Sequence, residues 1–400
     1  MAGPFDGVRI IDLSSVLMGP LATQMFADLG ADVIKVEPPQ GDILRGIGPG
    51  RHDDMRALYL TLNRNKRSIV LDMKSPEGRD AVLRLVKDAD VLFFNIRPQS
   101  MARLGLDYET VRAANDRIIY CGAYGFAQDG PFAAKPAYDD LIQGAVGLPW
   151  LSEKLTGKPS YVPFSIADHL VGMYAAFCLS AALHHRQKTG EGQQVEVPMY
   201  ETMTQTVMTH HMFGKTFVPP LGQAGYTRQI APARKPYRTS DGHICTLIIT
   251  DRQWHRLFEM IDRPELKADP RFADIGNRTL HTDTLYELLE ASFPLRSTAE
   301  WLDLFEKSDI PAMPMQSLDQ LLDDPHLKAT QFFRNVDHPT EGQLQAMKVP
   351  ANWSVSATDE FRSHAPRLGE HSEEILKEAG YSETDIRTLL ASGTTAGPRP

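Results

Sequence analysis

Carboxylates at two places far apart in the sequence have the chemistry for catalysis. Asp168 precedes the apolar run 170–183, and the pair Asp139-Asp140 stands at the start of another predicted helix. A carboxylate at a helix N-terminus is kept ionised by the helix dipole, so it could act as a nucleophile. The same position suits a side chain that caps the helix, because Asp is a preferred N-cap residue. The residues alone leave both roles of Asp168 open.

Cationic and amide side chains stand around two expected strands, 68–71 and 90–94. They are Lys66, Arg67, Lys74, Asn95, Arg97 and Arg103. In an open α/β sheet ligands bind beyond the carboxyl ends of the strands, and both Arg and Lys bind phosphate. This basic cluster therefore predicts a site for a polyphosphate or an adenine-containing ligand. Solvated surface charge that pairs with helix ends is the competing explanation.

Short β-branched runs alternate with helical segments through the first two hundred residues. Strands are expected at 8–13, 31–36, 68–71, 90–94, 117–121 and 194–197. This alternation is typical of βαβ units and a parallel sheet. The loop after the first strand holds one glycine, Gly19, followed by Pro20, whereas pyrophosphate binding in a dinucleotide fold needs several glycines. Nicotinamide or flavin binding is therefore disfavoured.

The composition is that of an ordinary globular protein. Of 400 residues 42% are hydrophobic, and 51 acidic against 42 basic residues give a net charge of −9, which disfavours nucleic acid or an anionic membrane as partner. The apolar run 170–183 is shorter than the roughly 20 residues that span a bilayer. The cysteines Cys121, Cys178 and Cys245 lie far apart, so neither a disulfide framework nor a metal site is expected. With no secretory signal at the start, the expected location is cytoplasmic.

The pattern changes near residue 215, where a loop rich in Pro and Gly precedes a hairpin signal at 240–242. Residues 1–214 are therefore expected to form the N-terminal part of a large domain, and residues 215–330 a small domain. Residues 331–400 would form a C-terminal segment with one strand around 348–353.

Seven stretches in order resemble the class III CoA-transferase family, whose members include formyl-CoA, carnitine and crotonobetaine CoA-transferases, in a superfamily with the acyl-CoA racemases. Together they cover nearly the whole chain. They lie within residues 12–37, 65–74, 95–105, 168–172, 189–193, 241–242 and 368–371, and include Asn95-Ile96-Arg97-Pro98 and Thr189-Gly190-Glu191-Gly192-Gln193.

The resemblance implies an α/β fold in an interlocked homodimer. Each chain would have a large Rossmann-like domain with a parallel sheet, completed by the C-terminal segment, and a smaller inserted α+β domain. Coenzyme A would bind the large domain at the positions that match the family's binding residues, together with Arg97 of the basic cluster: Val16, Leu71, Lys74, Asn95, Ile96, Arg97 and Arg103. The family nucleophile matches Asp168, and the acid beside it matches Asp139.

By this resemblance the protein moves CoA from an acyl-CoA donor to a carboxylic acid acceptor. Asp168 would attack the thioester to give a mixed anhydride, and the thiolate would return to form an aspartyl-CoA thioester, which the acceptor attacks. Amides at the start of the Asp168 helix could stabilise the oxyanion. Acyl-CoA and a small carboxylic acid are the expected partners, without metal or tightly bound cofactor.

Some positions depart from the formyl-CoA transferase pattern. Leu17, Pro38 and Pro136 replace a glutamine, an arginine and a lysine, and a glycine-run loop is not evident between residues 222 and 242. These differences favour a larger or less polar acid than oxalate, such as a dicarboxylate.

Two alternatives remain from the sequence. An acyl-CoA racemase pairs a histidine with an aspartate as bases. Tyr138 occupies the histidine position here, and tyrosine, with a pKa near 10, is a poor base. A non-catalytic acyl-CoA-binding protein is the other alternative, and the presence of both Asp139 and Asp168 weighs against it.

Overall fold

The computed structural model describes residues 3–356 and 361–398, which divide into two compact units. Unit 1 holds Met1–Val146, Pro163–Gln205 and Lys328–Pro400, and unit 2 holds Gly147–Val162 and Thr206–Leu327. The sequence expects a small domain over 215–330. Unit 2 also takes in α7 (Leu148–Thr156). The sequence did not indicate this, because α7 lies far from the change of pattern near residue 215.

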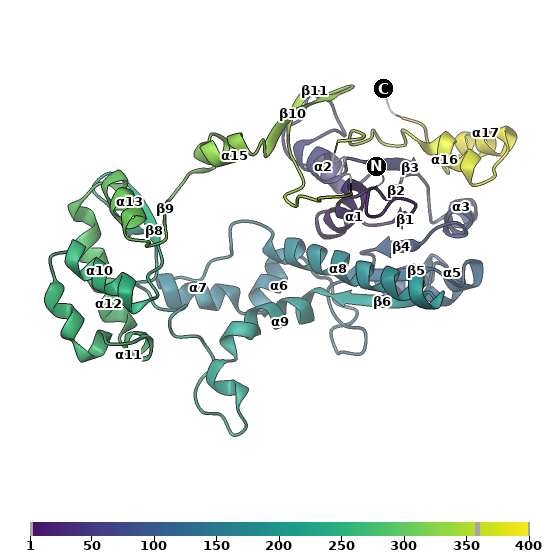
Figure 1. Cartoon of the computed structure of the whole chain (residues 1–400). Coiled ribbons are helices and arrows are strands. Elements are labelled where there is room, and N and C mark those ends of the chain that lie inside the picture. Colours follow the sequence, from purple (N-terminus) through teal and green to yellow (C-terminus); the bar gives the residue numbers. More distant parts are fainter. Residues whose placement is uncertain (1–2, 357–360, 399–400) are drawn as a thin grey trace. The chain divides into compact units, whose positions relative to one another are not determined.

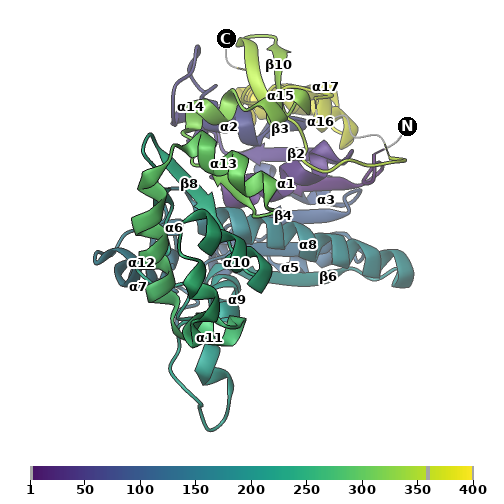
Figure 2. The ribbon, with the colours of Figure 1, turned by 60° about the vertical axis from the view of Figure 1, so that its left-hand side comes forward.

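Unit 1 is built on a six-stranded sheet in the order β3-β2-β1-β4-β5-β6, with every neighbouring pair parallel. Figure 2 labels four of these strands, β3, β2, β4 and β6. The strands are β1 (Arg9–Asp12), β2 (Asp32–Glu37), β3 (Lys66–Val70), β4 (Val91–Phe94), β5 (Ile119–Tyr124) and β6 (Gln193–Pro198). The predicted parallel α/β sheet is confirmed. Its order reverses between β1 and β4, the switch point at which Rossmann-like sheets bind ligands.

Helices link these strands. In unit 1 they are α1 (Met18–Asp28), η1 (Ile43–Gly46), α2 (Ala57–Leu62), α3 (Pro76–Val86), α4 (Pro98–Arg103), α5 (Tyr108–Ala114), α6 (Asp139–Ala145) and α8 (Ile166–Thr189), while α9 (Met199–His211) crosses into unit 2. A Cβ at Gly172 of α8 would lie 2.6 Å from the carbonyl oxygen of Met18. Glycine at this position therefore lets α8 pack closely against α1.

The C-terminal segment belongs to unit 1 and covers the edge strand β3 (Figure 1). Its helices are α16 (Ser372–Glu378) and α17 (Glu383–Ala391), and Ile375 and Ile386 join the main core. The Ser372 hydroxyl accepts a hydrogen bond from the Val70 N–H at 3.1 Å, and the Thr395 hydroxyl donates to the Val70 carbonyl at 2.7 Å. These bonds satisfy backbone groups that an open edge would leave unpaired.

One predicted strand is wrong. A hairpin of β10 (Phe333–His338) and β11 (Gly342–Met347) forms instead, and residues 348–356 contain no strand. Gly342 turns the hairpin with a φ of 65°, and Pro350 lacks the N–H that a strand would use.

Unit 2 is an α+β unit around an aromatic core that includes Trp254, Phe258, Phe293 and Trp301. Its antiparallel sheet contains β7 (Tyr237–Arg238), β8 (His243–Thr246) and β9 (Ala312–Pro314), which confirms the hairpin predicted at 240–242. Its further helices are η2 (Phe213–Thr216), α10 (Asp251–Met260), η3 (Pro264–Ala268), η4 (Pro270–Phe272), α11 (Ile275–Leu280), α12 (Thr282–Ser292), η5 (Phe293–Leu295), α13 (Thr298–Lys307) and α14 (Leu318–Leu322), with α15 (Pro325–Ala329) at its end.

Helix α8 is longer than the apolar run that marks it in the sequence. Within the part of the chain that the structure describes, it is the one helix long and apolar enough to cross a membrane by length and composition. Its 24 residues extend beyond 170–183 because both charged ends, with Asp168 and Arg186, remain helical. The helix packs against α1, β5 and β6, and 44% of its apolar window is buried. Core helices of soluble proteins share these properties, so the length of α8 is weak evidence for a membrane.

Candidate active site

The loops after β1 and β4 meet at the switch point of the sheet. Asn95 joins them, because its Oδ1 accepts from the Ser15 N–H at 3.1 Å and its Nδ2 donates to the Ser15 carbonyl at 2.7 Å. Val16, with a φ of 68°, donates its N–H to Asp42 Oδ1 at 3.1 Å. Ile96 packs against the main core. The positions matched to CoA binding around β1 and β4 therefore lie together where an α/β sheet receives its ligand.

Three exposed cations lie at the ends of helices α3 and α4. Lys74 precedes α3, Arg97 precedes α4, and Arg103 ends α4. Arg97 donates to the Ala134 carbonyl and Arg103 to the Ser100 hydroxyl, at 3.0 and 2.7 Å. Within residues 3–356 and 361–398 none of the three forms an ion pair. Their charges can therefore serve an anionic ligand. Leu71, by contrast, is fully buried after β3 and can offer backbone only.

The other two cations of the predicted basic cluster do not belong to it, and this part of the prediction is wrong. β3 begins at Lys66, so Lys66 and Arg67 lie at the amino end of the strand. Lys66 is fully buried and donates to Asn63 Oδ1 and the Pro20 carbonyl, both at 3.0 Å. Arg67 pairs with Asp32 at 2.8 Å. Both charges are taken up by structural partners.

The structure brings Asp139 and Asp168 together within unit 1. Asp139 is the first residue of α6 and Asp168 the third of α8. The backbone N–H of Asp168 donates to Asp139 Oδ2 at 3.0 Å. Gln143 is fully buried and donates to Asp139 Oδ1 at 2.5 Å, which fixes that carboxylate. The sequence analysis missed Gln143, although its position four residues after Asp139 on a helix could have indicated the contact.

Asp168 is not the helix cap. Ser165 stands at the N-cap position of α8, and the Asp168 side chain accepts no hydrogen bond from any residue that the structure describes. Its N–H is engaged by Asp139, so this amide is not free to stabilise an oxyanion. What remains is a half-buried carboxylate without a hydrogen-bond partner among the described residues, and its oxygens are therefore available for chemistry.

The surroundings of Asp168 disfavour its charge. Burial and the neighbouring Asp139 charge raise its pKa to about 6 from the ordinary 3.8, and His169 opposes this shift. At pH 7 the carboxylate is still mostly ionised. Perturbed carboxylates of this kind are concentrated at functional sites.

We expect the acid limb of the pH–rate profile to report this pKa. Because a nucleophilic carboxylate must be deprotonated, kcat/KM should be half-maximal near pH 6 and fall about tenfold per pH unit below it. Asp139→Asn removes the negative charge that raises the pKa, so its midpoint should move to lower pH. A wild-type midpoint near 4, or one that Asp139→Asn does not move, would contradict this assignment.

The chain is similar to a set of CoA-transferases along its whole length. The model of CoA-transferase family III matches residues 5–372. A succinate–glutarate CoA-transferase of Agrobacterium fabrum is 32% identical, over 94% of this chain and 95% of the relative. A succinyl-CoA:mesaconate CoA-transferase of Haloarcula hispanica is 32% identical, over 94% and 97%. A formyl-CoA:oxalate CoA-transferase of Rhodopseudomonas palustris is also 32% identical, over 100% and 99%.

Solved structures agree with this assignment. A CaiB/BaiF family protein from Brucella suis has a TM-score of 0.78 and 31% identity, covering 95% of this chain and 100% of that one. A protein from Mycobacterium tuberculosis has a TM-score of 0.80 and 28% identity, covering 93% and 99%. The parallel sheet with its switch point between β1 and β4, the carboxylate pair in unit 1 and these matches agree. The chain belongs to CoA-transferase family III.

Proposed function

We propose that the protein transfers CoA between two carboxylic acids through covalent intermediates on Asp168. The observation that carries this proposal is the Asp139–Asp168 pair, in which Asp139 holds the Asp168 backbone and leaves the Asp168 carboxylate without a partner. A carboxylate exchanging acyl groups with thioesters is suited to reversible transfer, because anhydride and thioester intermediates divide the reaction into smaller steps.

The steps balance without an oxidant or reductant. An Asp168 oxygen attacks the carbonyl carbon of the donor thioester, and the C–S bond breaks. CoA departs as a thiolate, and a mixed anhydride between Asp168 and the donor acid is formed. The thiolate attacks the Asp168 carbonyl, which releases the donor acid and forms an aspartyl-CoA thioester. The acceptor carboxylate then displaces the thiolate from Asp168, which gives a second mixed anhydride. The thiolate attacks the acceptor carbonyl of this anhydride, which yields the new acyl-CoA and releases the Asp168 carboxylate. Asp139 acts by positioning the Asp168 main chain.

The acids that we propose are dicarboxylates, with succinyl-CoA as a donor. Relatives of similar identity are named for succinate, glutarate and mesaconate, and Leu17 presents an apolar side chain where the formyl-CoA transferase pattern has a glutamine. Leu17 is half-buried against the apolar cluster around Leu44.

A panel assay tests the proposed donor and acceptors. The enzyme is incubated with succinyl-CoA or with formyl-CoA, each in parallel with glutarate, mesaconate, acetate or oxalate, and the new acyl-CoA is identified by mass spectrometry. Glutaryl-CoA or mesaconyl-CoA should form fastest. Transfer confined to formyl-CoA and oxalate would contradict the dicarboxylate proposal, and absence of any transfer would contradict the CoA-transferase reaction itself.

Lys74 and Arg103 should contribute to CoA binding. Lys74→Ala and Arg103→Ala each remove an exposed cation at a position matched to CoA binding, so each should raise KM for acyl-CoA by about tenfold with kcat changed little. Steady-state kinetics with a single donor and acceptor measure both constants. Arg252→Ala, an exposed arginine of unit 2 paired with Asp309, is the matched control. Unchanged KM in both test variants would locate CoA elsewhere.

We further propose that the active protein is a homodimer. Helix α8 exposes Met173, Tyr174 and Phe177, with exposed fractions of 53%, 41% and 66%, and the last two rings stack at 6.1 Å between centroids. A contiguous apolar surface of this kind is typical of an interface. Light scattering should give a dimer mass that persists on dilution, and Phe177→Glu should abolish it. An active monomer of 44.6 kDa would contradict the proposal.

A further inference from the structure

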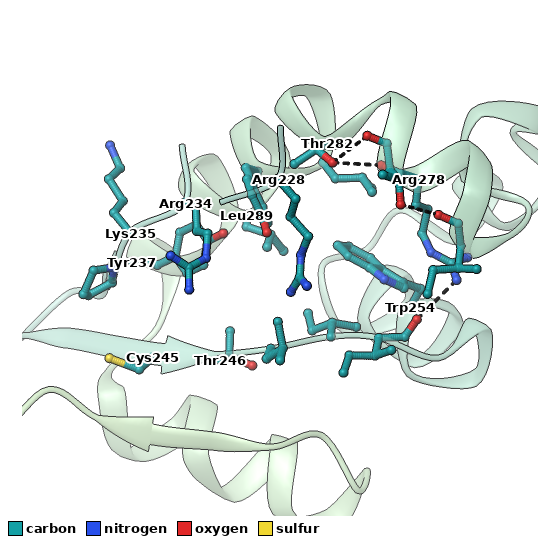
Figure 3. Close-up of a pocket in the computed structure, with 18 of the residues that line it drawn as sticks. Arg228, Arg234, Lys235, Tyr237, Cys245, Thr246, Trp254, Arg278, Thr282 and Leu289 are labelled. Atoms are coloured by element: carbon teal, nitrogen blue, oxygen red, sulfur yellow. Dashed lines mark hydrogen bonds between the residues drawn. The ribbon is translucent and has the colours of Figure 1, made fainter. Parts of the chain in front are cut away.

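Unit 2 contains a cavity of about 400 Å³ to which no role is assigned above. It lies between β8 and α12, with Trp254 of α10 on its wall (Figure 3). All of its lining residues belong to unit 2, whereas the catalytic pair and the positions matched to CoA binding belong to unit 1. Its volume falls in the range of pockets that hold small organic molecules.

The floor of this cavity is apolar. Ile248, Trp254, Leu285 and Leu289 line it and are at the same time buried members of the unit 2 core. Because these side chains are fixed by core packing, the floor is preformed rather than created by a ligand. An apolar body placed there would lose its contact with water, which is the main source of affinity in such pockets.

Arg228 brings a positive charge into this apolar space. The side chain is half-buried and points into the cavity between β8 and α12 (Figure 3). Burial opposes its charge, but the hydroxyl groups of Tyr286 and Tyr226 are its nearest electrostatic partners, and their influence raises the pKa of Arg228. Within the described ranges 3–356 and 361–398 no carboxylate forms an ion pair with Arg228. A charge in an apolar setting is costly without a counter-ion, so an entering anion would stabilise it.

The other cations of the cavity show the contrast. Arg278 pairs with Asp251 and donates to the Phe272 carbonyl at 2.8 Å, and Lys235 pairs with Glu290 at 2.7 Å. Arg234 is exposed, and among the residues that the structure describes it has no ion-pair partner. Of the cations that line the cavity, Arg228 and Arg234 therefore have no counter-ion among the described residues, while Arg278 and Lys235 are neutralised.

We propose that this cavity binds a free carboxylic acid with an aliphatic or aromatic body. The carboxylate would pair with Arg228, which can donate two parallel N–H bonds, and the body would lie on Leu285 and Leu289. The carboxylate would neutralise Arg228, whose side chain points into the cavity, while Arg234 is exposed to water. The proposal does not depend on the chemistry of Asp168, because the two residue sets do not overlap.

The alkylation rate of Cys245 provides a measure of ligand binding in the cavity. It is exposed and lines the cavity, whereas Cys121 is buried and Cys178 is half-buried outside it. Octanoate and phenylacetate should slow alkylation of Cys245 by iodoacetamide, with saturation and without slowing alkylation of Cys178, as measured by peptide mass spectrometry of the full-length protein. Octanol has the same chain without the charge, so its apparent affinity should be weaker by about tenfold or more.

Variants test the assignment of the charge. Arg228→Gln should weaken octanoate protection by about tenfold or more, whereas Arg252→Gln, outside the cavity, should not. If Arg228→Gln fails to fold, Thr246→Phe provides the second test, because its ring would fill the cavity beside β8 and abolish protection.

Three results would overturn the proposal: equal protection by octanol, full protection in both Arg228→Gln and Thr246→Phe, or protection by coenzyme A but not by octanoate. Octanoate should still protect Cys245 in Asp168→Asn, which is expected to be inactive as a transferase. Loss of protection in that variant would assign the acid to the Asp168 site and also overturn the proposal. Failure of the transferase assay alone would leave the cavity result unaffected.

Discussion

Asp168→Asn should abolish CoA transfer while the protein stays folded. Asn keeps the size of the side chain but cannot form the anhydride or the thioester, so activity should fall by on the order of a thousandfold or more. Asp140→Asn is the matched control, because Asp140 is the exposed neighbour of Asp139 on α6 and takes no part in the pair. An active Asp168→Asn enzyme, shown by mass spectrometry not to have deamidated, would refute the nucleophile assignment.

A trapping experiment tests the proposed covalent intermediate. Wild-type protein incubated with donor acyl-CoA and treated with hydroxylamine or borohydride should carry a modification on the peptide that contains Asp168. Asp168→Asn and Asp168→Ser should carry none, whereas Asp140→Asn should behave like wild type. A label on another carboxylate would move the chemistry to that residue.

The same substitution should stabilise the fold. The pKa of Asp168 is about 6 in the folded protein and 3.8 ordinarily. The Asp168 charge therefore lowers the free energy of unfolding, and this loss is complete above pH 6 and absent below about pH 4. Asp168→Asn removes the charge and should raise the free energy of unfolding at pH 7 by about 1–2 kcal/mol. This gain should vanish near pH 4. A residue that served only as a helix cap would show little change at either pH, because Asn caps a helix as well as Asp does.

Lys66→Met should destabilise the protein by about 3 kcal/mol or more. Lys66 and Asp12 are both fully buried, with Nζ and Oδ2 3.3 Å apart. Burial lowers the pKa of Lys66 to about 8 although Asp12 opposes the shift, so the ammonium is mostly charged at pH 7. Removing it leaves the buried Asp12 carboxylate with Lys35 as its remaining cationic neighbour. Chemical denaturation measures the loss.

Lys74→Met is the matched control for Lys66→Met. Lys74 is exposed and unpaired within the described chain, so its replacement should leave the unfolding free energy within about 0.5 kcal/mol of wild type. It should instead raise KM for acyl-CoA. If Lys66→Met were stable and impaired only in KM, Lys66 would belong to the ligand site after all.

The local signals in the sequence were sufficient for the parallel sheet. β-branched runs with a regular helical spacing place all six strands within a few residues of the observed bounds, because strand and helix formation in βαβ units follows local hydrophobic periodicity. The order of those strands could not be predicted from local signals. It depends on which strands pair over long distances in the sequence, and this pairing places the loops of Val16 and Asn95 together.

The sequence by itself determined the residue types of the site, and tertiary structure decided their roles. On the residues alone the sequence favoured a cap for Asp168 and left a nucleophile open, because a helix start suits both. Only the approach of Asp139 from α6 engages the Asp168 N–H, and the Asp168 carboxylate has no hydrogen-bond partner among the described residues. Lys66 and Lys74 have the same side chain and stand close together in the sequence. One is buried against Asp12 and the other is exposed, because burial depends on neighbours that are distant in sequence.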